Sequence, residues 1–332
     1  MRIRYEEMQQ EFQRVLRRHG LSAERAARCA TIFAENSLVG VASHGLNRFP
    51  GLIDFIQKGY VNPQAELTKV AGSGAWEQWD GQQGVGPLNA DTCTERAMTL
   101  AREHGVGCVG LRNTNHWMRG GYYGWLAAEA GFVLISWTNT KPNMPAWGGI
   151  DRHVGNNPLV LAVPRAGGPV VLDMAMSQFS IGRMEGAQRA GQHLPSPGGY
   201  DDQGQLTTDP GAILKTNRVL PAGYWKGSGL AILLDLVAVL LAGGLATYQI
   251  GQQVTEYGVS QVFMAFDVTR TGSTEAIQQT VEGVIADLHA STPVSEGGEV
   301  LYPGERALRT RRENLEQGIP VEPTIWERVR TL

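Results

Sequence analysis

From about residue 67 onward, short strand-like segments alternate with helix-like segments, and this alternation constrains the fold more than any other feature of the sequence. The segments AWEQWDG, VGCVGLRN and FVLISWTN have the composition of strands, while NADTCTERAMTLAREHG and GYYGWLAAEAG have that of helices. Alternating elements of this kind place helices against a sheet, because each element must bury one apolar face. We therefore predict an α/β layer over most of the chain.

The first 60 residues follow a different pattern, in which apolar residues recur with helical spacing. Helices are predicted in YEEMQQEFQRVLRRHG and SAERAARCATIFAENSLVG, each ending at a glycine suited to a C-cap. A third helix is predicted to begin near Arg48 with Asn47 as its N-cap, because Pro50 is tolerated in a first turn. This leaves residues 43–45 in the loop before that helix.

The second half of the chain adds loops and one long apolar segment. Short strands PLVLAVP and PVVLDMAM lie in a Gly-, Pro- and Asn-rich region, 141–221, and loops of that length usually serve a site. The apolar run LAILLDLVAVLLAGG carries Asp235 and has about 15 residues, fewer than the roughly 20 that span a bilayer. We interpret it as a buried core helix. A strand VSQVFMAFDV, a helix TEAIQQTVEGVIADLHAS and a helical tail from about Gly304 follow.

Charge and cysteine content exclude several functional classes. The 332 residues include 29 Lys plus Arg against 32 Asp plus Glu, so no basic field exists to hold nucleic acid. Cys29, Cys93 and Cys108 lie far apart without a C-x-x-C motif, which predicts neither a disulfide framework nor a cysteine metal site. The N-terminus lacks an apolar export segment, and the histidines lack metal-ligand spacing. We expect a cytoplasmic protein with no metal and no membrane partner.

A G-x-G-x-x-G string occurs at Gly105, Gly107 and Gly110. In a dinucleotide-binding fingerprint this string follows a strand and opens a helix, so that pyrophosphate meets the helix N-terminus. Here the order is reversed, because a predicted helix ends at Gly105 and a strand follows. Glu129, the acidic residue about 20 positions further on, lies inside a predicted helix instead of at a strand end. We interpret the glycines as a helix cap and a closely packed strand.

Two polar segments are candidates for a ligand site. RNTNHWMRGG places Asn115, His116 and Arg119 after an apolar strand, where open α/β sheets expose ligand-binding loops; a loop with His116 bonded to backbone is equally consistent. SHGLNRF supplies His44, which exchanges a proton near neutrality, and Arg48, whose guanidinium suits a carboxylate. Alternatively, His44 caps the preceding helix and Arg48 pairs with a surface carboxylate.

Two further segments have cofactor-like chemistry. YWKGSGL opens the apolar helix with Lys226 and two glycines, which can cradle phosphate, although Ser228 as a simple N-cap explains the segment equally well. VVLDMAMS ends a predicted strand with Asp173. That carboxylate can bind a ribose hydroxyl, orient a histidine or form a structural pair.

Taken together, eight segments resemble the type-2 malate/L-lactate dehydrogenase family in unbroken order over nearly the whole chain. They are ASHGLNRFPGLI, GLRNTNHWMRGGYYGW, ISWTNTKPNMPAWGG, GNNPLVLAVP, VVLDMAMS, GYWKGSGLAILLDL, EYGVSQVFMAF and LYPGERA. The resemblance implies an α/β (α+β) fold distinct from Rossmann, with a mixed sheet and a helical sub-domain, working as a homodimer. It divides the chain into a helical sub-domain, residues 1–66, joined by helices from about 215–250 and 303–332, and an α/β sub-domain, residues 67–214 and 251–302.

The same resemblance assigns residues to roles. His44 would be the proton donor and Arg48 the ligand of the substrate carboxylate, with Ser43, His116 and Arg119 near the substrate. NAD, or alternatively NADPH, would contact Val170, Val171, Leu172, Asp173, Met174, Ala175, Trp225, Lys226, Gly304, Glu305 and Arg306. The segment VPRAGGPVV is slightly longer than the family pattern, and Lys141 stands where a neutral residue is expected.

The implied activity is reduction of a sugar-derived 2-keto acid, with hydride from the nicotinamide and a proton from His44. One alternative is another activity of the same family, on malate, lactate, ureidoglycolate or a cyclic imino acid. Trp117, Met118, Arg119 and Lys141 are the pocket residues expected to differ between these activities. A non-enzymatic sugar-acid binding protein is the alternative from another class.

Overall fold

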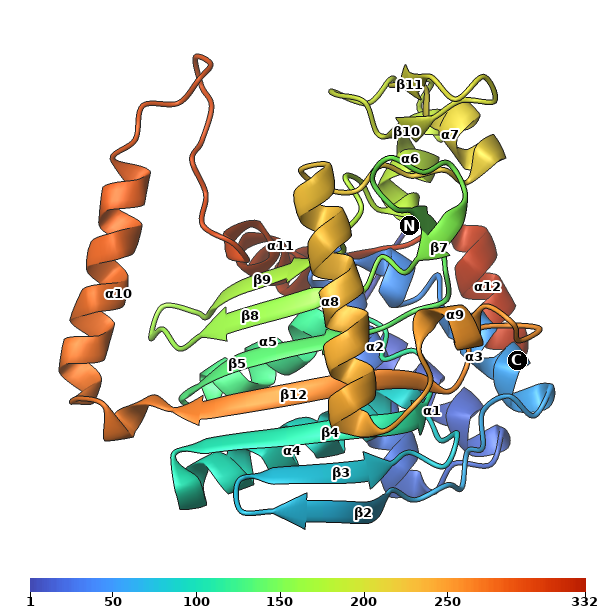
Figure 1. Ribbon diagram of the computed structural model, residues 1–332. Coiled ribbons are helices and arrows are strands. Elements are labelled where there is room, and N and C mark those ends of the chain that lie inside the picture. Colours follow the sequence, from blue (N-terminus) through green and yellow to red (C-terminus); the bar gives the residue numbers. More distant parts are fainter.

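The computed structural model describes residues 1–332 and is built on a seven-stranded mixed sheet with helices on both faces (Figure 1). Only one neighbouring pair of its strands, β3 with β4, is parallel. Rossmann sheets are mostly parallel, so the prediction of an α/β fold distinct from Rossmann is confirmed. In spatial order the strands are β2 (Thr68–Ser73), β3 (Trp76–Asp80), β4 (Val106–Thr114), β12 (Val259–Asp267), β5 (Phe132–Thr138), β8 (Leu159–Val163) and β9 (Val170–Met174).

Opposite faces of the sheet carry different helices. Helices α4 (Gly86–His104) and α5 (Gly120–Glu129) pack on one face, and α8 (Trp225–Ala242) crosses the other (Figure 1). The glycines of β4 allow both approaches. A Cβ atom at Gly107 would lie 2.1 Å from the carbonyl oxygen of Ala97 on α4, and one at Gly110 would lie 2.5 Å from that of Leu241 on α8. Gly105 caps α4 with a φ of 87°, so the glycine string is a cap and a packed strand, as predicted.

The close approach at Gly110 gives a stability prediction. The variant Gly110→Ala should lower the free energy of unfolding by about 1–3 kcal/mol, because its Cβ meets backbone that cannot rotate away. The matched variant Gly283→Ala adds the same methyl group where no atom lies within 4 Å, so its stability should be unchanged or slightly higher. Urea unfolding of both variants measures the difference, and equal midpoints would contradict the packing described.

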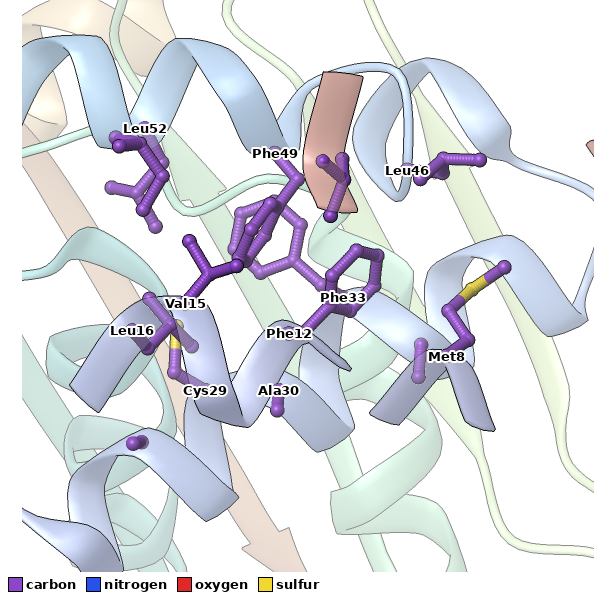
Figure 2. Close-up of a cluster of buried hydrophobic side chains, with 14 of the residues drawn as sticks. Met8, Phe12, Val15, Leu16, Cys29, Ala30, Phe33, Leu46, Phe49 and Leu52 are labelled. Carbon is purple, nitrogen blue, oxygen red and sulfur yellow. The ribbon is translucent and has the colours of Figure 1, made fainter. Parts of the chain in front are cut away.

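The N-terminal helices enclose a separate apolar core built around three phenylalanines (Figure 2). The Phe12 and Phe49 rings stack with centroids 4.2 Å apart, and Phe33 meets Phe49 edge-on at 5.2 Å. The chain ends join this unit, because β1 (Arg2–Ile3) pairs with β13 (Ile319–Pro320) and α12 contributes Trp326 and Val329 to the same core. The helices concerned are α1 (Tyr5–Arg18), α2 (Ala23–Leu38), α3 (Phe49–Gln57) and α12 (Pro323–Thr331).

The start of α3 differs from the prediction in two details. Arg48, not Asn47, is the N-cap residue, and no side chain caps the helix. The residues before it, Ala42–His44, form a short 3₁₀ turn instead of an irregular loop. The 3₁₀ turn supplies the missing contact, because the Gly45 carbonyl accepts hydrogen bonds from the Arg48 and Phe49 amides. Pro50 does lie in the first turn, as predicted.

The prediction that the apolar run forms a buried core helix is wrong for one side of α8. Small residues such as Ala231 and Ala238 are buried against the sheet, but Leu233, Leu236 and Leu240 are 59%, 50% and 76% exposed. By length and composition alone α8 meets the requirement for a membrane-crossing helix. Its inner side nevertheless packs on β4, β5 and β12. The division into two sub-domains, including the assignment of residues 215–250 to the helical one, stays a prediction.

The remaining elements surround this framework. Apart from the sheet strands β8 and β9, residues 141–221 contain short elements that form a lobe beside the N-terminal end of α8 (Figure 1). The helix α10 stands away from the sheet, beyond the ends of β12, β5 and β8 (Figure 1). The elements are β6 (Met144–Pro145), β7 (Arg152–Val154), α6 (Ile181–Arg189), β10 (Gly199–Tyr200), β11 (Leu206–Thr207), α7 (Pro210–Thr216), α9 (Thr247–Ile250), α10 (Thr274–His289) and α11 (Glu305–Gln317).

Candidate active site

His44 lies at the end of the 3₁₀ turn that connects α2 to α3, where neighbouring groups fix both its backbone and its ring. Asn36 on α2 donates a hydrogen bond from Nδ2 to the His44 carbonyl at 3.1 Å. The Ser43 hydroxyl lies 3.0 Å from His44 Nδ1, which leaves Nε2 for a ligand. His44 therefore does not serve as a helix cap through its side chain. Its ring stacks on that of His116, with centroids 5.7 Å apart.

His116 follows β4 in a loop that is tied down from several sides. Its Nδ1 accepts a hydrogen bond from the Met118 amide at 2.9 Å, so the ring proton is on Nε2. Burial lowers the pKa of His116 well below its ordinary value, and the charges of Arg48 and His44 lower it further. His116 is thus a neutral imidazole that can donate from Nε2. The ring is bonded to backbone, as the second interpretation expected, and it also stacks on His44, so a contact with substrate stays a prediction.

Three other residues of this loop, Asn115, Trp117 and Met118, are structural, contrary to the sequence prediction. Asn115 donates from Nδ2 to the carbonyls of Tyr60, Gln83 and Gly84, so its amide group anchors the loop. Trp117 and Met118 are buried in the apolar cores, which removes them from any substrate pocket. Burying these two apolar side chains in the cores removes apolar surface from water, which is favourable. Lys141 is exposed, and its backbone amide donates to Glu256.

Asp173 joins the cluster from the edge strand β9. Its Oδ2 accepts a hydrogen bond from the Gly121 amide at 2.7 Å and lies 3.9 Å from Arg119 Nε. A Cβ atom on Gly121 would lie 2.9 Å from that same Oδ2, so the paired glycines at the start of α5 make this contact possible. The sequence showed the glycine pair but gave no way to connect it with Asp173, which lies 52 residues away.

The charges around His44 have opposing effects. Burial lowers the pKa of His44 below its ordinary value, the Asp173 carboxylate raises it, and the positive charges of Arg48 and Arg119 lower it. The net effect is a lowered pKa. The imidazolium form of His44 is therefore a stronger acid than histidine in water, and Asp173 is the group that stabilises it.

Arg48 presents a free guanidinium beside the two histidines. The residue is exposed at the N-cap of α3, and no carboxylate pairs with it. The expected alternative, a surface ion pair, is therefore not present. A planar guanidinium at the start of a helix suits a carboxylate ligand, because the helix N-terminus adds partial positive charge.

Among the expected cofactor residues, those from β9 and the start of α8 offer free groups. The strand β9 is the last of the sheet, so its outer backbone edge is open apart from the bond of the Val171 amide to Pro303 at 2.9 Å. Trp225 is 65% exposed, and Lys226 beside it is exposed as well. An aromatic ring, an ammonium group and free backbone fit a dinucleotide. Ser228 is not an N-cap, because its hydroxyl accepts from the Trp147 amide.

The α11 end of the expected cofactor set is only partly available. Both oxygens of the Glu305 carboxylate accept bonds within the protein, from His289, Arg309 and the Tyr302 amide. Gly304 has a φ of 95°, and a Cβ there would lie 3.1 Å from the Val171 amide, so this position requires glycine. Arg306 is exposed and remains free. Glu305 therefore holds the segment in place, and Arg306 is the group there that can meet a ligand.

Comparison with known proteins identifies the chain's relatives. The malate/L-lactate dehydrogenase family model matches residues 3–330. Proteins named 2,3-diketo-L-gulonate reductase from Citrobacter koseri and Klebsiella pneumoniae are 42% identical over 334 residues, which covers all of both chains. Sulfolactate dehydrogenase from Methanocaldococcus jannaschii is 28% identical with a TM-score of 0.91, covering 99% of this chain and 95% of that one.

A second solved structure agrees, since malate dehydrogenase from Pyrococcus horikoshii is also 28% identical, with a TM-score of 0.89 over 99% of this chain and 93% of that one. The fold, the ordered motifs and full-length similarity thus lead to one conclusion. The chain is an oxidoreductase acting on a CH–OH group and belongs to the malate/L-lactate dehydrogenase family.

Proposed function

We propose that this enzyme reduces the C2 ketone of a sugar-derived 2-keto acid, and specifically 2,3-diketo-L-gulonate to 3-dehydro-L-gulonate. The observation that carries the proposal is the 42% identity, over the full length of both chains, to enzymes named for that reaction. The cluster of His44, Arg48, His116 and Asp173 supports it, because it offers a proton donor and a carboxylate ligand side by side.

The mechanism assigns one task to each group. A nicotinamide cofactor, when bound, supplies the hydride that C2 of the ketone accepts. Protonated His44 gives its proton to the ketone oxygen, so the products are the alcohol and a neutral imidazole. Arg48 holds the carboxylate, which fixes the ketone near His44 and removes much of the entropic barrier. His116 donates from Nε2 to a substrate oxygen, and Asp173 stabilises the imidazolium form of His44 before the transfer.

A pH dependence follows from the surroundings of His44. Reduction requires the protonated form, so kcat/KM should be highest at low pH and fall as pH rises through a midpoint below 6.5. Asp173→Asn removes an attractive charge and should move the midpoint lower, whereas Arg119→Gln removes a repulsive charge and should move it higher. Initial rates between pH 4.5 and 8, about two units around the ordinary value, measure these shifts.

The control for this experiment is Lys58→Gln, an exposed charge on the N-terminal helical unit that should leave the midpoint unchanged. Shifts of the same sign in the Asp173 and Arg119 variants would contradict the assigned electrostatics. So would a wild-type midpoint above 6.5.

The cofactor proposal is NADH, held along β9, against Trp225 and Lys226, and near Gly304 and Arg306. Arg306 is also the free cation that a 2′-phosphate would need, so NADPH remains the alternative. Comparing kcat/KM for the two cofactors decides between them. If Arg306→Gln weakens NADPH but not NADH, Arg306 is the phosphate contact.

Two further proposals concern the oligomeric state of the enzyme and its location in the cell. We infer a homodimer, supported by the apolar face that Leu233, Leu236 and Leu240 expose on α8, since monomers rarely leave such a face open. Light scattering of the purified protein measures the assembly. A cytoplasmic location, with no nucleic acid, metal or membrane partner, fits the three unpaired cysteines, of which Cys29 and Cys93 are buried.

A second candidate activity is a 2-hydroxy-acid dehydrogenase of the malate or lactate type. The solved structures named for sulfolactate and malate support it at 28% identity. Following NADH loss with a panel of 2-keto acids separates the two. A kcat/KM for 2,3-diketo-L-gulonate below that for oxaloacetate or pyruvate would overturn the first proposal. The non-enzymatic alternative has lost its support, because the chain belongs to a family of dehydrogenases.

A further inference from the structure

A cavity of about 170 Å³ lies between α2, α5 and α11, and Arg119 is one of its lining residues. Its walls include Glu35 and Val39 from α2, Tyr122 and Trp125 from α5, and Arg311 from α11. The mechanism above uses none of these five residues. The volume is below that of pockets for drug-sized ligands, which indicates a small metabolite.

The Arg119 guanidinium lines this cavity without a hydrogen-bond partner. The residue is only 8% exposed, and its closest carboxylate oxygen, Asp173 Oδ2, is 3.9 Å from Nε and already accepts from the Gly121 amide. Burial lowers the pKa of Arg119, which is the sign of a charge taken out of water without full compensation. A buried guanidinium with free donors is costly unless an anionic acceptor meets it.

The other charged side chains of the cavity already have partners. Arg311 donates to both oxygens of Glu35, at 3.2 and 3.1 Å, and Trp125 donates from Nε1 to Glu129 at 2.7 Å. Tyr122 makes no hydrogen bond through its hydroxyl, and burial raises its pKa, so the hydroxyl stays a donor. The side chains of Arg119 and Tyr122 thus make no hydrogen bond within the protein, and both residues belong to the segment that opens α5.

The free donors and the walls define the chemistry of the ligand. Arg119 is the cation of this cavity that no carboxylate meets at hydrogen-bond distance, so it matches one negative charge, while Glu35 and Glu129 would repel a dianion such as phosphate. Val39, Leu126 and the Trp125 ring offer an apolar surface for the rest of the molecule. We propose that this cavity binds a small organic monocarboxylate, with its carboxylate on Arg119 and its apolar part against Val39, Leu126 and Trp125.

Occupancy of this site would act on the reaction through Arg119. The Arg119 charge lowers the pKa of His44, whereas the Asp173 carboxylate raises the pKa of both His44 and Arg119. A carboxylate on Arg119 offsets that charge, so His44 holds its proton to higher pH. This consequence rests on the proposed function of His44, whereas binding in the cavity does not depend on it.

Benzoate is a suitable probe, and isothermal titration calorimetry with the full-length protein measures its binding directly. Wild type should bind benzoate saturably, and Arg119→Gln should weaken the binding by 10-fold or more, as expected for loss of a charge-assisted contact. Arg48→Gln should bind it as wild type does. Benzamide, the neutral isostere, should bind at least 10-fold more weakly than benzoate.

A second variant tests the cavity in case the Arg119→Gln protein fails to fold. Leu126→Trp keeps the guanidinium but fills the cavity, so it should also abolish benzoate binding while its circular dichroism stays native. The proposal is overturned if wild type shows no saturable binding at about 10 mM benzoate. It is also overturned if Arg48→Gln, and not Arg119→Gln, loses binding, since benzoate would then occupy the substrate site.

The natural carboxylate has two possible sources, the keto-acid substrate itself or a separate metabolite. Titrating 2,3-diketo-L-gulonate into Arg48→Gln protein saturated with benzoate distinguishes them. Displacement identifies the substrate as the occupant, and retention of benzoate identifies a separate metabolite. These titrations measure binding without turnover. They would therefore still test the proposed benzoate site if the reaction assigned to the enzyme were wrong.

Discussion

Replacing His44 with alanine should lower turnover of the keto acid by about 100-fold or more, with a smaller effect on KM. The reason is that no other group can give the proton to the developing alkoxide. His116 is the nearest imidazole, but its pKa is well below the ordinary value and its Nδ1 is bonded to the Met118 amide. Water would have to replace His44 as the acid. The loss of NADH absorbance at saturating substrate measures the effect.

His193→Ala is the matched control for this experiment. That histidine is exposed, and its side chain hydrogen-bonds to Thr208 in the lobe beside α8, so its replacement should leave turnover near the wild-type value. Turnover of the His44 variant within about threefold of wild type would reject His44 as the proton donor, since general acids contribute at least 100-fold.

Replacing Arg48 with alanine should raise KM for the keto acid by about 10- to 100-fold, which corresponds to the 1.5–3 kcal/mol of a hydrogen bond to a charged group. Turnover should change less, because the same ion pair is made before and during the reaction. Arg48 has no other partner in the protein, so its loss should leave the unfolding free energy unchanged. Steady-state kinetics and urea unfolding measure the two effects.

Arg17→Ala, an exposed arginine on α1, is the control for the loss of a surface charge. A substrate amide tests the cause, because it lacks the carboxylate and should be bound equally weakly by wild type and the Arg48 variant. If the Arg48 variant binds the carboxylate substrate as tightly as wild type does, Arg48 has no role in its capture.

Much of the fold could be predicted from local sequence signals. The helix that ends at Gly105 and the strand that follows are present as predicted. A glycine that can adopt the αL conformation is typical of a helix end, and alternating apolar residues are typical of a strand. The reversed order around that glycine was enough to exclude a Rossmann motif. The exact start of α3 was missed by one residue, since a 3₁₀ turn replaced the expected side-chain cap.

The long apolar helix shows where local signals fail. Its composition predicted burial on all sides, yet Leu240 and its neighbours along the outer side are exposed. The hydrophobicity of a helix indicates that its side chains favour burial, but it does not indicate which part of the same chain or of another chain buries them. A second chain can cover it as well as the same chain can, and sequence composition does not distinguish the two.

Within the site, sequence by itself determined the reactive residue types: a histidine and an arginine near the third helix, another histidine after a strand, and an aspartate at a strand end. Only the tertiary structure decided that Asn115 anchors a loop, that His116 is neutral, and that the charges of Asp173 and Arg119 act on the pKa of His44. The physical reason is that a proton affinity or an unpaired charge depends on burial and on neighbours from distant segments. Those neighbours meet only when β4, β9 and the N-terminal helices pack together.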